Sequence, residues 1–446
     1  MRPPNQRGGG AGRFRPITAR NLEKAPFWHS LDSEIREAIS VVSRILPFRS
    51  NDYVVEELID WEQVPEDPIF QLTFPQRGML HPEVFRRVRG HLRRGEGEAL
   101  QATVREVRLS LNPHPAGQLT HNVPMLDGKP LPGLQHKYDE TVLFFPSQGQ
   151  TCHAYCSYCF RWAQFVDLPE MQFEARESED LTAYLRAHPE VSDVLVTGGD
   201  PLIMKTKVLA RYIEPLLSPD LDHVRNIRIG TKSLAYWPHR FVTDPDSDEL
   251  LRLLERVVAA GRHMSIMGHY SHPMELSTPV AREAVRRIRS TGAEVRAQAP
   301  CIRHVNDDPD VWATLWRDAV SLGIVPYYMF VERDTGARNY FEVPLVRVYE
   351  IFRDAYRQVS GLARTVRGPS MSAFPGKVRI LGISEIRGEK VFVLDMLQGR
   401  KSEWVRRPFF AKFDPRATWL DQLRPAFRER FFFQTEPGAL DGFSAA

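Results

Sequence analysis

The sequence predicts a mixed α/β fold, in which parallel strands and helices form a partial (β/α)6 barrel between an N-terminal helical subdomain and a C-terminal β-containing cap. From residue 140 onward, short apolar and β-branched runs alternate with longer helical stretches, which is typical of parallel βα units. The first quarter of the chain has helical periodicity instead. The 446 residues are 42% hydrophobic and 26% charged, the composition of a folded chain with a large core.

Glycine content, charge and apolar periodicity divide the chain into four regions. The first is rich in glycine and arginine and has no apolar periodicity, so we expect a disordered basic arm. Helical patterns follow, then alternating strands and helices, then two further strands in a separate cap. The predicted regions are the arm at 1–24, the helical subdomain at 25–135, the partial barrel at 136–345 and the C-terminal lysine and cap region at 346–446.

The first predicted helix of the helical subdomain begins after Asp32, a residue type that caps helices. Apolar residues then recur at helical spacing from Ile35 to Leu46, and Pro47 ends the run. Two more helices are predicted at 82–94 and 98–109.

The barrel region contains six predicted strands separated by helices. Such strands pair in parallel through right-handed crossovers, and ligands then bind at their carboxyl ends. The strands are 141–146, 192–197, 226–231, 264–269, 294–299 and 325–331, the helices are 178–187, 205–217, 247–260, 278–291 and 309–322, and the cap strands are 377–383 and 389–396.

Charge and hydropathy exclude several kinds of partner. Lys and Arg number 59 against 56 Asp and Glu, and the net charge of +3 is too near balance to favour nucleic acid or an anionic membrane. No run approaches the ~18 apolar residues of a membrane helix. The first residues lack the apolar centre of a signal peptide. We therefore expect a cytoplasmic protein with no membrane and no nucleic-acid partner.

Three of the four cysteines, Cys152, Cys156 and Cys159, lie together in the loop after the first barrel strand. Thiolates at this spacing can hold three irons of one cubane cluster and leave the fourth iron open for a second cofactor. A zinc site completed by His153 is the alternative. Cys301 lies in apolar surroundings and is expected to be a buried residue rather than a fourth ligand.

This cysteine motif, with Tyr158 before the last cysteine and the turn Gly198-Gly199-Asp200 after the next strand, resembles the radical S-adenosylmethionine (SAM) superfamily. The resemblance implies a [4Fe-4S] cluster whose open iron binds SAM, with the glycine-rich turn against the methionyl part. Between about residues 110 and 380 the chain is similar to the lysine 2,3-aminomutase family. The matching strings include HKY at 136–138, CFR at 159–161, TGGDP at 197–201, HYSHP at 269–273, PYY at 326–328 and FPGK at 374–377.

The family resemblance implies a second cofactor, pyridoxal 5'-phosphate (PLP), and assigns residues to roles. Lys377 matches the lysine that forms a Schiff base with PLP, and Lys137 lies where the family usually has an arginine on the PLP phosphate. Arg161 matches the residue that binds the substrate α-carboxylate, a task suited to a bidentate guanidinium. His269 and Gln298 are candidates for contacts with SAM. The implied reaction converts an α-amino acid into a β-amino acid.

Two departures from the family pattern concern the substrate side chain. Where the lysine enzymes have aspartates, this chain has Arg333 and Ser370. A cation at Arg333 disfavours a lysine side chain, by on the order of several kcal/mol in a dry site. We therefore expect an anionic or neutral polar substrate, glutamate first, bound by Arg333 and Ser370. A one-residue shift that brings Asp334 into the pocket is the alternative.

The hypothesis is thus a radical SAM, PLP-dependent amino-acid 2,3-aminomutase reduced by a donor such as flavodoxin or ferredoxin. No cysteine follows Cys301, so we expect this chain to lack the zinc-binding cysteine tail that is involved in assembly of the lysine enzymes. A homo-oligomer and a monomer both stay open. Three alternatives stay open. They are a mutase acting on a protein lysine, a radical SAM enzyme without PLP, and a non-enzymatic iron–sulfur protein.

Overall fold

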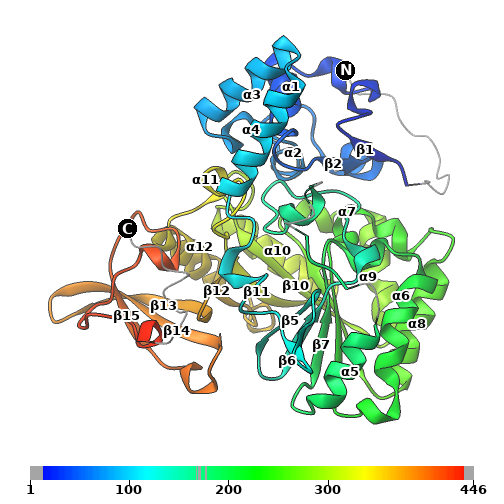
Figure 1. The fold of residues 1–446 in the computed structure, drawn as a ribbon, viewed down its shortest axis with the longest axis vertical. Helices are drawn as coiled ribbons and strands as arrows, with labels where there is room; N and C mark the ends of the chain where they lie inside the picture. The colour runs from blue at the N-terminus through cyan, green and yellow to red at the C-terminus, as the bar shows by residue number, and fades with distance from the viewer. Residues whose placement is uncertain (1–13, 167, 169–171, 176–177, 436–446) are drawn as a thin grey trace.

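A computed structural model describes residues 14–166, 168, 172–175 and 178–435. An eleven-stranded sheet runs through the molecule in the order β15-β14-β13-β12-β11-β10-β9-β8-β7-β6-β5 (Figure 1). Neighbouring strands from β6 to β12 are parallel. These strands are β6 (Thr141–Phe144), β7 (Asp193–Val196), β8 (Asn226–Thr231), β9 (His263–His269), β10 (Glu294–Cys301), β11 (Val325–Val331) and β12 (Arg367–Ser372).

Helices separate the successive strands, and their order confirms the mixed α/β class. Strand β8 shows why the apolar runs become strands, because Ile227 and Ile229 are fully buried on one face while Arg228 lines a cavity on the other. The separating helices bury their apolar stripes against the sheet. They are α5 (Glu179–Ala187), α6 (Thr206–Ile213), α8 (Ser247–Ala259), α9 (Pro279–Ser290) and α10 (Pro309–Ser321).

The N-terminal region forms a mainly helical layer at the top of Figure 1. Its α-helices are α1 (Ser33–Val42), α2 (Pro68–Thr73), α3 (Pro82–Arg94) and α4 (Gly97–Ser110), in agreement with the predicted helices at 82–94 and 98–109. The expected disordered arm is wrong for residues 14–24. Strand β1 (Pro16–Thr18) pairs with β2 (Arg49–Asn51), and Leu22 is buried.

The physical reason is that apolar residues among the basic ones find distant partners. The ring of Phe14 packs edge-on against His153 and Trp237, more than a hundred residues away in sequence. Charge and glycine content do not reveal such contacts. Residues 1–13 of the expected arm lie outside the described residues.

The C-terminal strands, expected in a separate cap, continue the main sheet instead. Strands β13 (Gly376–Ile386), β14 (Glu389–Gly399) and β15 (Phe409–Lys412) continue the main sheet through β12, after helix α12 (Leu345–Arg357). Strand β12 escaped prediction because Gly368 and Pro369 are normally strand breakers. Gly368 lies so close to β11 that a Cβ there would be 2.4 Å from the carbonyl oxygen of Met329.

An edge strand and one short pair complete the described strands. Strand β5 (Leu134–Tyr138) forms the other edge of the main sheet, and β3 (Met125–Leu126) pairs with β4 (Lys129–Pro130). Among the described helices, none combines the length and apolar character needed to cross a membrane.

Candidate active site

The strands of the main sheet line a cavity of about 370 Å³. Every strand from β5 to β14 contributes at least one residue to its wall. Because side chains alternate along a strand, one face of each strand points into this space. The cavity brings together most of the residues that the sequence singled out. They are Lys137, Cys152, Cys156, Cys159, Arg161, Gly198, Gly199, His269, Gln298, Arg333 and Lys377.

The three cysteines of the motif line the cavity from the loop after β6, and the N-terminal region holds this loop in place. The backbone N–H groups of Tyr155 and Ser157 donate to the carbonyl oxygens of Arg49 and Leu72, at 2.8 and 2.9 Å. Burial raises the pKa of the Cys159 thiol to about 12. A thiolate here therefore requires a compensating cation, and the irons of a cluster would supply one.

His153 and Cys301 do not join this group. The Nδ1 atom of His153 lies 3.0 Å from the Ser233 hydroxyl, and its ring stacks on Trp237. Cys301 is fully buried, with its sulfur 3.9 Å from the carbonyl oxygen of Asn306. Within the described ranges, no three His, Cys, Asp or Glu side chains are grouped as one metal ion would require. The zinc alternative thus lacks its proposed fourth ligand.

The glycine-rich turn after β7 packs directly on the cysteine loop. A Cβ on Gly199 would lie 2.5 Å from the backbone nitrogen of Thr151, so only glycine fits there. Gly198 and Gly199 line the cavity, whereas Asp200 does not. We expected Asp200 to contact a cofactor.

Asp200 instead anchors the end of β8 behind the cavity wall. Its buried carboxylate accepts hydrogen bonds from the Thr231 hydroxyl and the Lys232 N–H, both at 2.8 Å, and from the Ser233 hydroxyl at 2.9 Å. A carboxylate with so many donors has little capacity left for a ligand. Asp200 positions Thr231 and Lys232, which do line the cavity.

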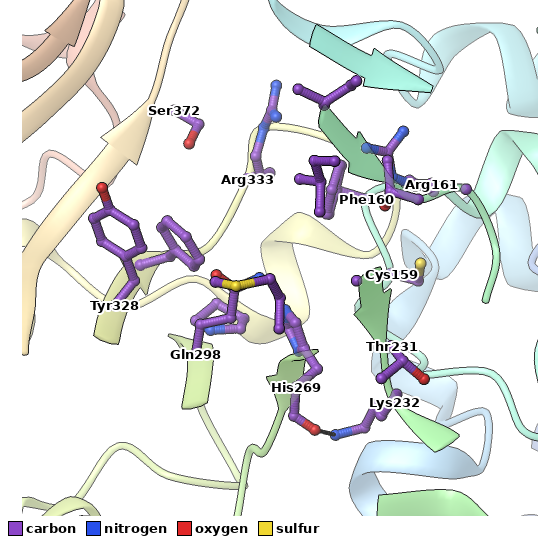
Figure 2. Close-up of a pocket in the computed structure, with 18 of the residues that line it drawn as sticks. Cys159, Phe160, Arg161, Thr231, Lys232, His269, Gln298, Tyr328, Arg333 and Ser372 are labelled. Atoms are coloured by element: carbon purple, nitrogen blue, oxygen red, sulfur yellow. Dashed lines mark hydrogen bonds between the residues drawn. The ribbon is translucent and has the colours of Figure 1, made fainter. Parts of the chain in front are cut away.

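His269 and Gln298 lie opposite each other on the paired strands β9 and β10. The hydroxyl of Tyr158 lies 3.1 Å from Nδ1 of His269, and burial, with the nearby Lys232 cation, lowers the pKa of His269 to about 3. The imidazole is therefore neutral. Lys232 donates to the carbonyl oxygen of His269 at 3.2 Å (Figure 2) and pairs with the buried Glu275 at 2.6 Å.

Lys377 lies across the cavity at the start of β13, with its ammonium nitrogen 4.1 Å from the ring centroid of Tyr328. Burial lowers the pKa of Lys377 to about 7, and the cations of Arg228 and Arg367 act in the same direction. A large fraction of this amine is neutral near pH 7. A neutral amine is the form that attacks a carbonyl carbon.

Other cations lie near Lys377. Lys137 donates to the carbonyl oxygen of Ala373. Burial lowers the pKa of Lys137 well below its ordinary value, and Arg400, Arg333 and Lys377 lower it further. Such a group of cations fits a phosphate, whose negative charge would offset their mutual repulsion.

Arg161 and Arg333 lie on either side of Phe160 (Figure 2), with their guanidinium carbons 4.9 and 5.2 Å from its ring centroid. Burial lowers the pKa of Arg161 to about 9 and also lowers that of Arg333. Nη1 of Arg161, and Nε and Nη2 of Arg333, are buried without a hydrogen-bond partner among the described residues. Unpaired buried N–H groups on cations are costly, so the geometry favours an anionic ligand between them.

The carboxyl groups beside Arg333 in sequence do not fill this role. Glu332 lines the cavity, but burial raises its pKa well above the ordinary value and so disfavours the charged form that would pair with Arg333. Asp334 does not line the cavity, and its backbone oxygen accepts a hydrogen bond from Asn112. The alternative in which Asp334 enters the pocket therefore loses support.

Ser370 does not line the cavity, although we expected it beside the substrate. The β12–β13 hairpin places Ser370 opposite Arg379 and Ser372 opposite Lys377, and Ser372 is the residue in the cavity wall. Ser370 is fully buried, and its hydroxyl has no hydrogen-bond partner within the described part of the chain. Spacing along the sequence could not give the register of this hairpin.

Sequence reasoning also missed several residues of the cavity wall. Phe160 follows the last cysteine directly, and its position next to the motif could have identified it. Tyr328 and Phe330 alternate on β11, which is the signal of an inward-facing pair. Arg400, beyond the end of β14, does not line the cavity but acts on the charge of Lys137, and it has no local signal because only the sheet brings it near that residue.

Comparisons relate this chain to known proteins. No protein-family profile matches the chain. An Aquifex aeolicus protein named "Putative L-lysine 2,3-aminomutase" is 31% identical over 398 residues, which span 89% of this chain and 92% of that protein. The L-lysine 2,3-aminomutase of Bacillus subtilis is 28% identical over 237 residues, 53% of this chain and 47% of that enzyme.

The glutamate 2,3-aminomutase of Clostridioides difficile is 28% identical over 214 residues, 48% of this chain and 47% of that enzyme. Among solved structures, a radical SAM methyltransferase from Sphaerobacter thermophilus is 15% identical and covers 52% of this chain and 68% of its own, with a TM-score of 0.37. This TM-score is too low to relate the two folds.

Aminomutases are isomerases, and the radical SAM type implies a [4Fe-4S] cluster and SAM. The extent and level of the Aquifex match establish the family. The chain belongs to the lysine 2,3-aminomutase family of radical SAM enzymes.

Proposed function

We propose that this protein is a PLP-dependent 2,3-aminomutase that converts an α-amino acid with an anionic side chain, glutamate first, into its β-amino acid. One observation carries the substrate class. Arg161 and Arg333 present buried, unpartnered N–H groups on either side of Phe160. Neither arginine forms an ion pair with a described residue.

A dicarboxylic amino acid matches these two cations. Arg161 would bind the α-carboxylate and Arg333 the distal carboxylate, since a guanidinium pairs with a carboxylate through two parallel hydrogen bonds. An ammonium at the end of the substrate would instead face Arg333 in a space shielded from water. The family includes an enzyme named for glutamate, which supports this choice. The same repulsion disfavours a lysine presented by a protein.

The residues of the two ends of the cavity fit the cofactors of such an enzyme. Cys152, Cys156 and Cys159 would hold the cluster, and Lys377 would bind PLP covalently, with Lys137 on its phosphate. When bound, the cluster and SAM supply a carbon-centred radical that removes a substrate hydrogen atom, and PLP holds the migrating nitrogen.

The chain's own residues orient these groups and keep water away. Gly198 and Gly199 allow a ligand to approach the backbone beside the cysteine loop. The neutral His269 can exchange hydrogen bonds without adding charge near the cluster. Strands β6 to β11 with their helices would form the predicted partial barrel, and a small acidic protein such as flavodoxin or ferredoxin would deliver the electron.

The test is a reversal of the charge at the distal arginine. Arg333→Asp should lower the ratio of kcat/KM for glutamate over lysine by at least about tenfold, because a carboxylate then faces the substrate side chain. Product formation from both amino acids would be followed by NMR under anaerobic conditions. Arg317→Asp, on the exposed side of α10, makes the same charge change away from the cavity and is the control.

Two results would contradict the proposal. One is wild-type enzyme that turns over lysine in preference to glutamate. The other is an Arg333→Asp variant whose substrate ranking is the same as that of Arg317→Asp, which would remove Arg333 from the substrate pocket.

A further inference from the structure

The sulfur of Cys156 lies 3.3 Å from the hydroxyl oxygen of Tyr236. Tyr236 ends the short helix α7 (Ser233–Tyr236), which follows β8, and it is almost completely buried. Its position is 80 residues beyond Cys156 in sequence. The cysteine motif itself gives no indication of this contact.

Asn51 and Lys232 fix the tyrosine at this sulfur. The buried side-chain amide of Asn51 donates both to the carbonyl oxygen of Tyr236, at 3.0 Å, and to that of His153, at 3.2 Å. One side chain therefore joins α7 to the cysteine loop. The ammonium of Lys232 lies 4.6 Å from the ring centroid of Tyr236, and Glu275 holds that ammonium at 2.6 Å.

The direction of the hydrogen bond follows from the chemistry of the two groups. A cysteine that binds iron is a thiolate and has no proton, so it can only accept. Tyr236 is buried, and a phenol hydroxyl carries its proton at neutral pH, so this group can donate. The hydroxyl must therefore be the donor and the sulfur the acceptor.

We propose that Tyr236 is a positioning residue that raises the reduction potential of the cluster through a hydrogen bond to the sulfur of Cys156. The inference rests on the cluster assigned under the proposed function. Reduction adds one electron to the cluster, and part of the added negative charge lies on the thiolate sulfurs. A hydrogen bond to sulfur therefore stabilises the reduced form more than the oxidised form. The Lys232 cation acts in the same direction.

Tyr236→Phe removes only the hydroxyl and keeps the ring under Lys232. The variant and the wild type would be reconstituted anaerobically, and iron and sulfide per chain would be counted. The midpoint potential would then be measured by EPR-monitored redox titration. We expect equal cluster content and a lower midpoint. The expected change is about fivefold in the reduction equilibrium, the worth of one hydrogen bond, or about 40 mV at 59 mV per tenfold change.

Tyr184→Phe is the matched control. It also removes one hydrogen-bonded hydroxyl, but the partner of Tyr184 is Nδ1 of His136, at 2.7 Å, and not a cysteine sulfur. We expect its midpoint to equal that of the wild type. A purely structural effect of losing a tyrosine hydroxyl would move both variants alike.

A second measurement detects the proton of the Tyr236 hydrogen bond directly. In the reduced wild-type cluster, proton ENDOR should show a strongly coupled hydrogen from Tyr236 that exchanges in D2O. Tyr236→Phe should lose this coupling and keep any coupling from Tyr158, which also interacts with Cys156. If the phenylalanine variant does not hold a cluster, 3-fluorotyrosine placed at position 236 keeps the hydroxyl and makes it a stronger donor. This replacement should raise the midpoint above that of the wild type.

The outcomes separate this inference from the proposed function. A wild type that assembles no [4Fe-4S] cluster would defeat the cluster assignment. In the other case the cluster is intact in the wild type, and Tyr236→Phe leaves both the midpoint potential and the exchangeable proton unchanged. This result, or a midpoint potential that does not change with 3-fluorotyrosine at position 236, would overturn only the role of Tyr236.

Discussion

The cavity has a cysteine end, with Cys152, Cys156 and Cys159, and a lysine end, with Lys377. The two ends differ in whether their charged side chains have partners within the protein. At the cysteine end, Lys232 pairs with Glu275, and Asp200 accepts hydrogen bonds from the Thr231 and Ser233 hydroxyls and from backbone N–H groups. At the lysine end, Lys137, Arg333, Arg400 and Lys377 lie near one another, and the described residues offer none of them a salt bridge.

This difference separates the tasks of the two ends. Matched charges fix the walls of the cysteine end before any ligand arrives, as required to hold a cluster and to present one open iron. Unmatched cations at the other end favour phosphate and carboxylate ligands, whose binding relieves repulsion. The substrate class that we propose therefore rests on charges that the protein leaves unpaired. The experiments below test the two ends separately.

The largest expected effect is at the cysteine end. Cys156→Ala removes a cluster ligand, so formation of 5'-deoxyadenosine from SAM should fall to background. Chromatography of dithionite-reduced reactions measures this product. Cys301→Ala, in the apolar core, is the control and should keep its activity. SAM cleavage at the wild-type rate in Cys156→Ala would disprove the cluster assignment.

A smaller effect is expected where the glycine turn packs on the cysteine loop. Gly199→Ala places a Cβ against the backbone of Thr151, which cannot move aside easily. We expect a loss of about 1 to 3 kcal/mol in the free energy of unfolding, measured by denaturant titration. Gly97→Ala is the control, because a Cβ at Gly97 meets no atom within 4 Å. Equal stability of the two variants would show that the turn tolerates a side chain.

At the lysine end, the reaction of Lys377 with PLP should depend on pH. Lys377 has its pKa lowered to about 7, so the amine is protonated and unreactive below that pH and neutral above it. The rate of adduct formation with PLP should rise about tenfold per pH unit below pH 7 and level off above it. Borohydride reduction followed by peptide mass analysis locates the adduct. A rate that still rises between pH 8 and 10 would indicate an ordinary lysine.

The sequence predicts much of the fold, because the strands and helices of the central sheet have strong local patterns. Strands β6 to β11 lie where the apolar runs predict them, and the three cysteines meet at one cavity because their spacing is short. The unpredicted strand β12 has Gly368 and Pro369, whose local preferences are overridden by close pairing with β11.

Contacts between distant segments explain most of what the sequence could not predict in the site. Ser370 and Ser372 differ only in the register of a hairpin. Asp200 looks like a ligand residue in sequence, yet hydroxyl groups from the next strand occupy its carboxylate. Tyr236 contacts Cys156 because the fold places the helix after β8 next to the cysteine loop. Motifs thus identify the reacting groups, whereas the groups that position them come from elsewhere in the chain.

The most direct test of the central claim is the product formed by the wild-type enzyme. Anaerobically reconstituted protein with PLP, SAM and dithionite would be incubated separately with carbon-13-labelled glutamate, glutamine and lysine, and the products followed by carbon-13 NMR. The unpaired Arg161 and Arg333 predict that β-glutamate forms fastest. Formation of β-lysine at a higher rate than β-glutamate would contradict the account.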